Sequence, residues 1–224
     1  VEVQRAGRPP VAHTVKDHAK FLHLGDDAVI QGVAVRVARR LGRGSVAEFR
    51  APVATAPEDA GVLELVKERS GWGQEQPNVH RGVAAYFCHN SYAAHVLDLT
   101  IENGAPRVQK VTCAIDCGIV VNPDAAANMA EGAIVDGIGN AFFGAMTFNN
   151  GVPEKKNFDS YRMIRMREAP REIAVHFVQN GIDPTGMGEP PFPPIFGAVA
   201  NALYKATDKR YYHQPFLGEQ PVVG

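Results

Sequence analysis

The stretch "LDLTIENGAPRVQKVTCAID", residues 97–116, predicts two strands joined by a tight turn. In its first part Leu97 and Leu99 alternate with polar residues, and this period of two is typical of a β-strand. Asn103-Gly104 then supplies two residues that tolerate the positive φ angles of a short hairpin turn. We therefore expect an antiparallel hairpin, with one face of its second strand formed by Val111, Cys113 and Ile115.

Further strands and helices are predicted on both sides of this hairpin. The segment 82–102, "GVAAYFCHNSYAAHVLDLTIE", predicts one or two strands, and 171–180, "REIAVHFVQN", predicts another. Asn150-Gly151 indicates a second hairpin, and 194–209 predicts a helix with an apolar stripe. Strands and helices in mixed order around one core indicate an α+β fold.

A second helix is predicted to begin after Asn122, which is a good N-cap and is followed by Pro123. Its expected buried face has the four-residue spacing of Ala130, Ile134, Ile138 and Phe142. Glycine inside a helix costs up to about 1 kcal/mol against alanine. Glycines there indicate close approach of another helix or of a ligand, and the sequence leaves both open for Gly132, Gly137 and Gly139.

The amino-terminal part has a different character, and we predict a boundary near His80. Residues 1–80 are expected to form a mainly helical segment and a linker, with one helix beginning at Asp27 and another at Pro57. Residues 81–224 are expected to form the α+β domain.

The composition excludes several classes of partner. Lys and Arg number 23 against 24 Asp and Glu, so no net field favours nucleic acid or a membrane surface. No apolar run approaches the roughly 20 residues of a membrane span. The three cysteines lack paired or metal-binding spacing, and they are interpreted as small apolar residues in or near strands.

The segment "GMGEPPFPP", residues 186–194, places Glu189 in a stiff frame. Gly186 and Gly188 leave room for a bulky neighbour, and the prolines restrict the backbone. The helix that follows is expected to turn free N–H groups towards the glutamate, which favours an anion nearby. A carboxylate held beside a ligand can act as a general base. The alternative is a proline-rich turn with a solvated glutamate.

The segment "GMGEPPFPPIFGAVANALYKATDKR" resembles the carboxyl-terminal signature of the molybdenum-binding subunit of the xanthine oxidase family. The resemblance is to the isoquinoline 1-oxidoreductase and aldehyde dehydrogenase type of beta subunit. It includes, in the family's order, "GVAAYFCHNSYAAHVLDLTI", "VTCAIDCGIVVNPDAAANMAEGAIVDGIG" and "NFDSYRMIRMREAPREIAVHF", and runs from about residue 58 to about residue 214. Little before residue 45 adds to it.

This resemblance implies a site and a chemistry. Glu189 would be the catalytic base, taking a proton from a hydroxyl on molybdenum while N-heteroaromatics or aldehydes gain oxygen from water. The metal would be held by molybdopterin, in its cytosine dinucleotide form, and not by protein side chains. The residues expected near the cofactor are Asn90, Ser91, Met129, Glu131, Gly132, Gly186 and Gly188, with the loop around His89.

The resemblance also implies partners, namely the remaining portion of the molybdenum subunit and an iron–sulfur electron-transfer subunit. The chain would then be a fragment, a split subunit or a degenerate relative, from a bacterial cytoplasm or periplasm. Two positions depart from the family's pattern: Asn90 replaces a glycine and Met129 replaces a glutamine. These departures favour the alternative of an inactive structural or assembly module that keeps the fold without the cofactor.

Overall fold

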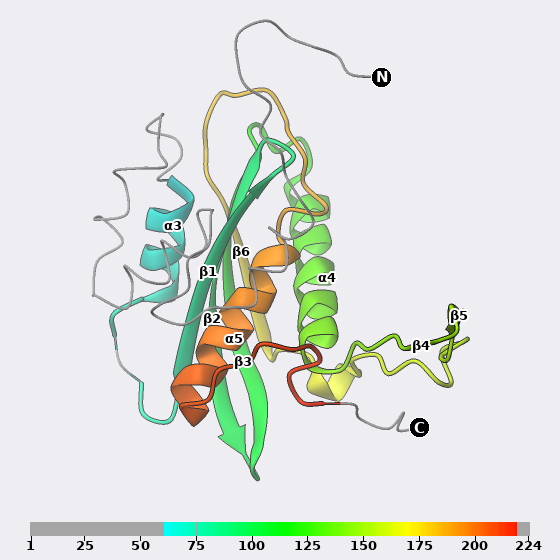
Figure 1. Ribbon diagram of the computed structural model, residues 1–224. Coiled ribbons are helices and arrows are strands. Elements are labelled where there is room, and N and C mark those ends of the chain that lie inside the picture. Colours follow the sequence, from blue (N-terminus) through cyan, green and yellow to red (C-terminus); the bar gives the residue numbers. More distant parts are fainter. Residues whose placement is uncertain (1–60, 75, 219–224) are drawn as a thin grey trace, which may run out of the picture.

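The computed structural model of the protein describes residues 61–74 and 76–218 (Figure 1). Its helices and strands alternate irregularly along the chain, so the predicted α+β class is confirmed. The helix predicted from Asp27 lies outside the described residues, and the boundary near His80 stays a prediction. The main elements are α3 (Gly61–Ser70), β1 (His80–Cys88), β2 (Ser91–Glu102), β3 (Ala105–Asp116), α4 (Pro123–Phe142), β6 (Glu172–Phe177) and α5 (Pro193–Thr207).

One four-stranded sheet, in the order β1-β2-β3-β6, forms the centre of the fold. The segment predicted as one or two strands forms two, β1 and β2, paired antiparallel. The predicted hairpin joins β2 to β3, with Leu97 opposite Val111 and the turn residues Asn103 and Gly104 at φ 51° and 79°. Strand β6 then pairs parallel to β3. The prediction of the central hairpin is therefore confirmed.

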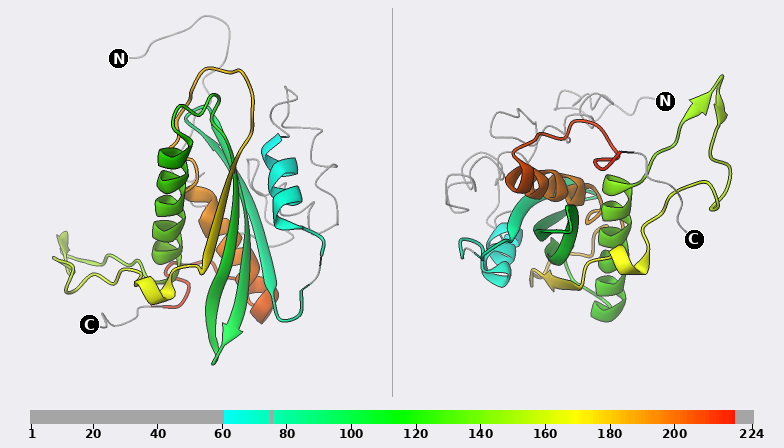
Figure 2. Two further views of the ribbon diagram at one scale, coloured as in Figure 1. Left: turned by 180° about the vertical axis from the view of Figure 1, so that it is seen from behind. Right: turned by 90° about the horizontal axis from the view of Figure 1, so that it is seen from below.

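Helices cover both faces of this sheet (Figures 1 and 2). The larger apolar cluster lies between the sheet and helices α4 and α5, and a smaller one lies under α3. Because α3 covers the second face, Asp98 is buried there, and Arg81 Nη2 donates a hydrogen bond to its Oδ2 at 3.2 Å. Burial on both faces means that polar residues of β2 also belong to the interior.

The glycines of α4 have different neighbours. Asn122 caps the helix as predicted, with its side chain accepting from the Ala125 N–H. A Cβ on Gly137 would collide with Ile195 of α5, and one on Gly139 would lie 2.9 Å from Ile164 Cγ2. A Cβ on Gly132 would meet no atom of the described residues within 4 Å. Packing explains the first two glycines, whereas Gly132 leaves an open surface.

Two further elements complete the described chain. The predicted second hairpin is confirmed as β4 (Phe148–Asn149) and β5 (Val152–Pro153), which project from the body as an arm (Figure 2). Helix α5 buries its predicted stripe against the sheet. Its close approach to β1 depends on Gly82, where a Cβ would collide with the Ala198 carbonyl. Within the described ranges, no helix is both long and apolar enough for a membrane span.

Candidate active site

The turn between β1 and β2 forms one side of the candidate site. His89 and Asn90 both adopt left-handed conformations, at φ 52° and 59°, and Ser91 then begins β2. Ser91 is buried, its Oγ donates to the Gly186 carbonyl, and it lies 2.7 Å from Thr185 Oγ1. The serine therefore fastens residues 185 and 186 to the end of the sheet.

The segment that leads to Glu189 contacts this turn closely. The Gly186 N–H donates to the His89 carbonyl at 3.1 Å. A Cβ on Gly186 would lie only 2.5 Å from His89 Cβ, so the position needs glycine. A Cβ on Gly188 would lie 2.9 Å from Met129 Cε of α4. The bulky neighbours of the two glycines in the structure are thus side chains of the chain itself.

The proline segment after Glu189 is attached to the sheet by a buried histidine of β2. Pro190 and Pro191 are buried, and the Phe192 N–H donates to the Glu189 carbonyl at 2.9 Å. His95 Nε2 lies 2.7 Å from the Pro191 carbonyl, and because a carbonyl only accepts, Nε2 carries the proton. Burial lowers the pKa of His95 to about 4, partly offset by this hydrogen bond, so the ring is neutral.

His95 was not among the predicted site residues, although its place in β2 indicates a buried side chain. His95 lies two and four residues before Leu97 and Leu99 in β2. Because successive side chains of a strand point to opposite faces, all three belong to the same buried face. A histidine at such a position needs a buried partner, and its partner lies 96 positions away in the sequence. That long-range contact is what local patterns do not predict.

The prediction that the first turn of α5 offers free N–H groups to an anion is wrong. The helix begins at Pro193, as predicted, but Pro193 and Pro194 have no N–H groups. The Ile195 N–H already donates to the Phe192 carbonyl at 3.3 Å. The first three positions therefore offer no free backbone donor to an anion.

Glu189 itself extends from this frame with one oxygen engaged. Its Oε2 lies 2.9 Å from His89 Nε2, and the two side chains are 67% and 57% exposed. Among the described residues, Oε1 has no hydrogen-bond partner. Burial first, and then the negative charge of Glu189, raise the pKa of Cys88 to about 11. Burial, followed by the charges of Cys88 and Glu189, also raises the pKa of Tyr86. The carboxylate therefore faces the end of β1.

The structure brings most of the predicted site residues together, but not all. Ser91, Gly186, Gly188 and Glu189 are joined by the contacts above, Asn90 lies in the adjoining turn, and Met129 reaches Gly188. Glu131 and Gly132 lie farther along the exposed surface of α4, where no described hydrogen bond or ion pair connects Glu131 to the group.

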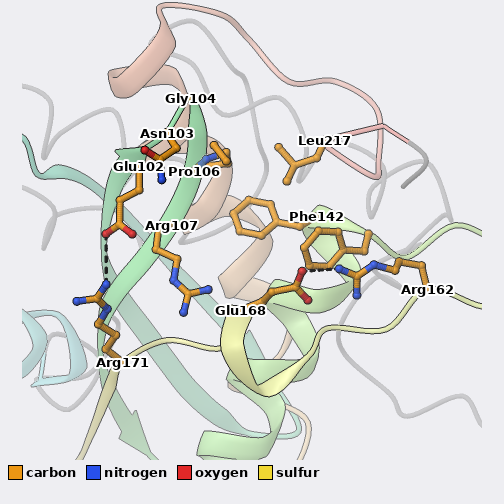
Figure 3. Close-up of a pocket in the computed structure, with 12 residues that line it drawn as sticks. Glu102, Asn103, Gly104, Pro106, Arg107, Phe142, Arg162, Glu168, Arg171 and Leu217 are labelled. Carbon is orange, nitrogen blue, oxygen red and sulfur yellow. Dashed lines mark hydrogen bonds and ion pairs between the residues drawn. The ribbon is translucent and has the colours of Figure 1, made fainter. Parts of the chain in front are cut away.

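A pocket that the sequence did not indicate lies at the opposite end of the sheet (Figure 3). It has a volume of about 670 Å³ and is lined by the β2–β3 turn, Phe142, Phe143, Leu217 and two ion pairs. Arg162 pairs with Glu168 and lies 4.2 Å from the Phe143 ring centroid, while Arg171 is 3.5 Å from Glu102. Figure 3 shows Arg107 extending between the two pairs. Glu189 does not line this pocket.

The sequence matches the model of a known family. The chain belongs to the molybdopterin cofactor-binding domain family, whose model matches residues 13–170. The match begins well before residue 45, so the expectation that little there is recognisable was wrong. It ends before the Gly-Glu-Pro segment, and the role of Glu189 therefore does not rest on it.

Relatives agree with the resemblance seen in the sequence. The chain is 30% identical over 187 residues to "Isoquinoline 1-oxidoreductase subunit beta" of Brevundimonas diminuta, covering 80% of this chain and 24% of that protein. It is 33% identical over 114 residues to "Membrane-bound aldehyde dehydrogenase [pyrroloquinoline-quinone]" of Gluconacetobacter polyoxogenes, covering 51% and 15%. The resemblance to a molybdenum-binding subunit of the xanthine oxidase family is thereby confirmed.

The fold also matches a solved structure. It superposes on the aldehyde oxidoreductase from Desulfovibrio gigas with a TM-score of 0.50 and 22% identity, over 56% of this chain and 14% of that one. At this identity the likeness concerns the fold. The chain spans about a quarter or less of the length of these relatives.

Proposed function

We propose that this chain is part of a molybdenum hydroxylase that oxidises N-heteroaromatics or aldehydes, with Glu189 as the general base. The observation that carries the proposal is the state of the Glu189 carboxylate. Its Oε2 is held by His89, and its Oε1 has no partner among the described residues. The segment around it is held by the hydrogen bond between Pro191 and buried His95 and by the Gly186 N–H on the His89 carbonyl. A general base requires an acceptor atom that is both available and held in place.

The residues around Glu189 are compatible with a flat cofactor. Gly132 leaves an open surface on α4, and Met129 lies three positions earlier on the same helical face. In the described part of the chain, Gly188 is covered only by the end of the Met129 side chain, which is flexible enough to move aside. We propose that Gly188, Met129 and Gly132 contact molybdopterin, with Asn90 and Glu131 at its edge.

Two of the predicted cofactor residues take a supporting role in this proposal. The Ser91 hydroxyl is already engaged by Thr185 and Gly186, and Gly186 packs against His89. We therefore assign Ser91 and Gly186 to holding the loop from behind. Their removal would displace Glu189 without removing a contact to the cofactor.

In the proposed reaction, the chain's own contribution is a proton transfer. When bound, the molybdenum cofactor would supply the oxidation of the substrate and the transfer of oxygen from water. Glu189 Oε1 would accept the proton released from that oxygen, while His89 continues to hold Oε2. The same proposal includes the cytosine dinucleotide form of the cofactor. It also includes two partners, an iron–sulfur subunit and the rest of the molybdenum subunit, and the "subunit" names of the relatives support the presence of partners.

A second candidate is an inactive structural or assembly module. Met129 favours it, because a thioether donates no hydrogen bond where the family's glutamine would. Met129 also occupies the surface over Gly188. Under this candidate the chain keeps the fold and holds no cofactor.

Metal analysis of the protein purified from its native source separates the two candidates. For the enzyme we expect about one molybdenum and one pterin per chain, and an N-heteroaromatic or aldehyde product that carries oxygen from labelled water. Protein without molybdenum and without turnover would reject the enzyme and favour the module. Molybdenum without incorporation of oxygen from water would reject the proposed reaction alone.

A further inference from the structure

We infer that His89 is a positioning residue for the Glu189 carboxylate, an inference that rests on the function proposed above. His89 Nε2 lies 2.9 Å from Glu189 Oε2, which is hydrogen-bond distance. An ionised carboxylate only accepts hydrogen bonds, so the imidazole is the donor. The ring therefore occupies Oε2 and orients the carboxylate with Oε1 open.

His89 is able to orient Glu189 because its own main chain is fixed. It sits in the left-handed region, and its carbonyl accepts the Gly186 N–H at 3.1 Å. The absence of a Cβ at Gly186 lets the two backbones approach closely. Residues 186–189 are thus held at both ends by His89, through its main chain at Gly186 and its side chain at Glu189.

Other groups near the carboxylate do not duplicate this arrangement. Tyr86 and Cys88 of β1 respond to the charge of Glu189, and Met129 of α4 contacts the neighbouring Gly188. Cys88 and Met129 are at most weak hydrogen-bonding groups. His89 is the one described residue with a hydrogen bond to the Glu189 side chain.

A matched pair of variants tests the inference in the cofactor-loaded protein. His89→Gln keeps an N–H donor, whereas His89→Phe keeps a ring and loses the donor. Both carry the same backbone strain at positive φ, so that cost cancels between them. We expect His89→Phe to lower kcat about 10- to 100-fold, as a misplaced catalytic group does, with KM and molybdenum content unchanged. His89→Gln should stay within about threefold of wild type.

Crystal structures of the same variants provide a readout that does not depend on turnover. The carboxylate should keep its position in His89→Gln and adopt another rotamer in His89→Phe. An unchanged carboxylate and an unchanged kcat in His89→Phe would overturn the inference. Glu189→Gln separates the two possible failures. Turnover that survives Glu189→Gln rejects the base itself, whereas an inactive Glu189→Gln beside an unaffected His89→Phe rejects only the positioning role.

Discussion

The two ends of the central sheet are built in different ways. At the Glu189 end, the β1–β2 turn and the proline segment constrain the backbone, and one carboxylate oxygen has no partner among the described residues. At the Arg162 end, around the pocket of Figure 3, Arg162 pairs with Glu168 and lies over the Phe143 ring, and Arg171 pairs with Glu102. A constrained backbone with an open acceptor is suited to chemistry, whereas a buried ion pair such as Arg162–Glu168 is suited to holding the fold together.

The surroundings of Glu168 and Glu189 reflect this difference. Burial alone would raise the pKa of Glu168, but hydrogen bonds from Arg162 and from the Arg165 N–H outweigh it and hold the pKa below its usual range. Glu168 therefore stays ionised and paired. Glu189 lies in a more exposed place, and His89 is its single described side-chain partner.

The largest expected effect on stability is at the Arg162 end. Arg162→Met leaves Glu168 without its buried partner, and we expect the free energy of unfolding to fall by about 3 kcal/mol. The kcat should change less than twofold, because the residue is remote from Glu189. Denaturant unfolding of this variant, of Glu168→Gln and of the double variant forms a cycle that isolates the pair. A large loss of kcat with unchanged stability would contradict the comparison.

His95 predicts a pH dependence of nearly the same size at the Glu189 end. The unfolded chain protonates this histidine near pH 6.5, whereas the folded protein does so only near pH 4. Between these values the unfolded state binds more protons, so stability falls as the pH falls, by roughly 3 kcal/mol in all. Unfolding measured from pH 7 to 4 checks this.

His95→Leu should abolish most of that slope, at the expense of the hydrogen bond to Pro191. His176→Gln is the matched control, since burial lowers the pKa of His176 as well and contributes with the same sign. A pH dependence of stability that persists in His95→Leu and disappears in His176→Gln would show that His176 causes it, which would contradict the prediction.

Gly186→Ala should disturb the Glu189 end moderately. The added Cβ would lie 2.5 Å from His89 Cβ, so the loop must shift, with an overpacking cost of about 1–3 kcal/mol. We expect kcat to fall at least tenfold, since Glu189 moves with the loop. Unfolding curves together with steady-state kinetics measure both effects. A variant with wild-type kcat would show that the close contact at Gly186 does not position Glu189.

Gly132→Ala has the smallest expected effect on stability, and it should raise the free energy of unfolding where the other variants lower it. Nothing lies within 4 Å of the added Cβ, and alanine is favoured in a helix, so the cofactor-free protein should gain up to about 1 kcal/mol of stability. If the proposed cofactor contact is correct, the same methyl group should lower the molybdenum content. Thermal unfolding and metal analysis test the two parts, and unchanged metal content would remove Gly132 from the proposed site.

Local sequence patterns were sufficient for much of the fold. The Asn103-Gly104 turn, the Asn122 cap and the stripe of α5 each depend on neighbouring residues, and each was predicted correctly. The contacts that complete the site join residues 96 and 100 positions apart, His95 to Pro191 and His89 to Glu189. The Arg162 end likewise combines distant segments. No local period encodes such contacts, because they arise only when the sheet brings its strand ends together.

The most direct test of the base assignment is the turnover of Glu189→Gln per bound molybdenum. Loss of a general base lowers kcat about 10²- to 10⁴-fold, and we expect a fall in that range with cofactor content and melting temperature unchanged. Glu154→Gln changes an exposed carboxylate next to β5, outside the proposed site, and is the matched control that should keep nearly full kcat. A Glu189→Gln protein that binds the cofactor and turns over within about threefold of wild type would contradict the account.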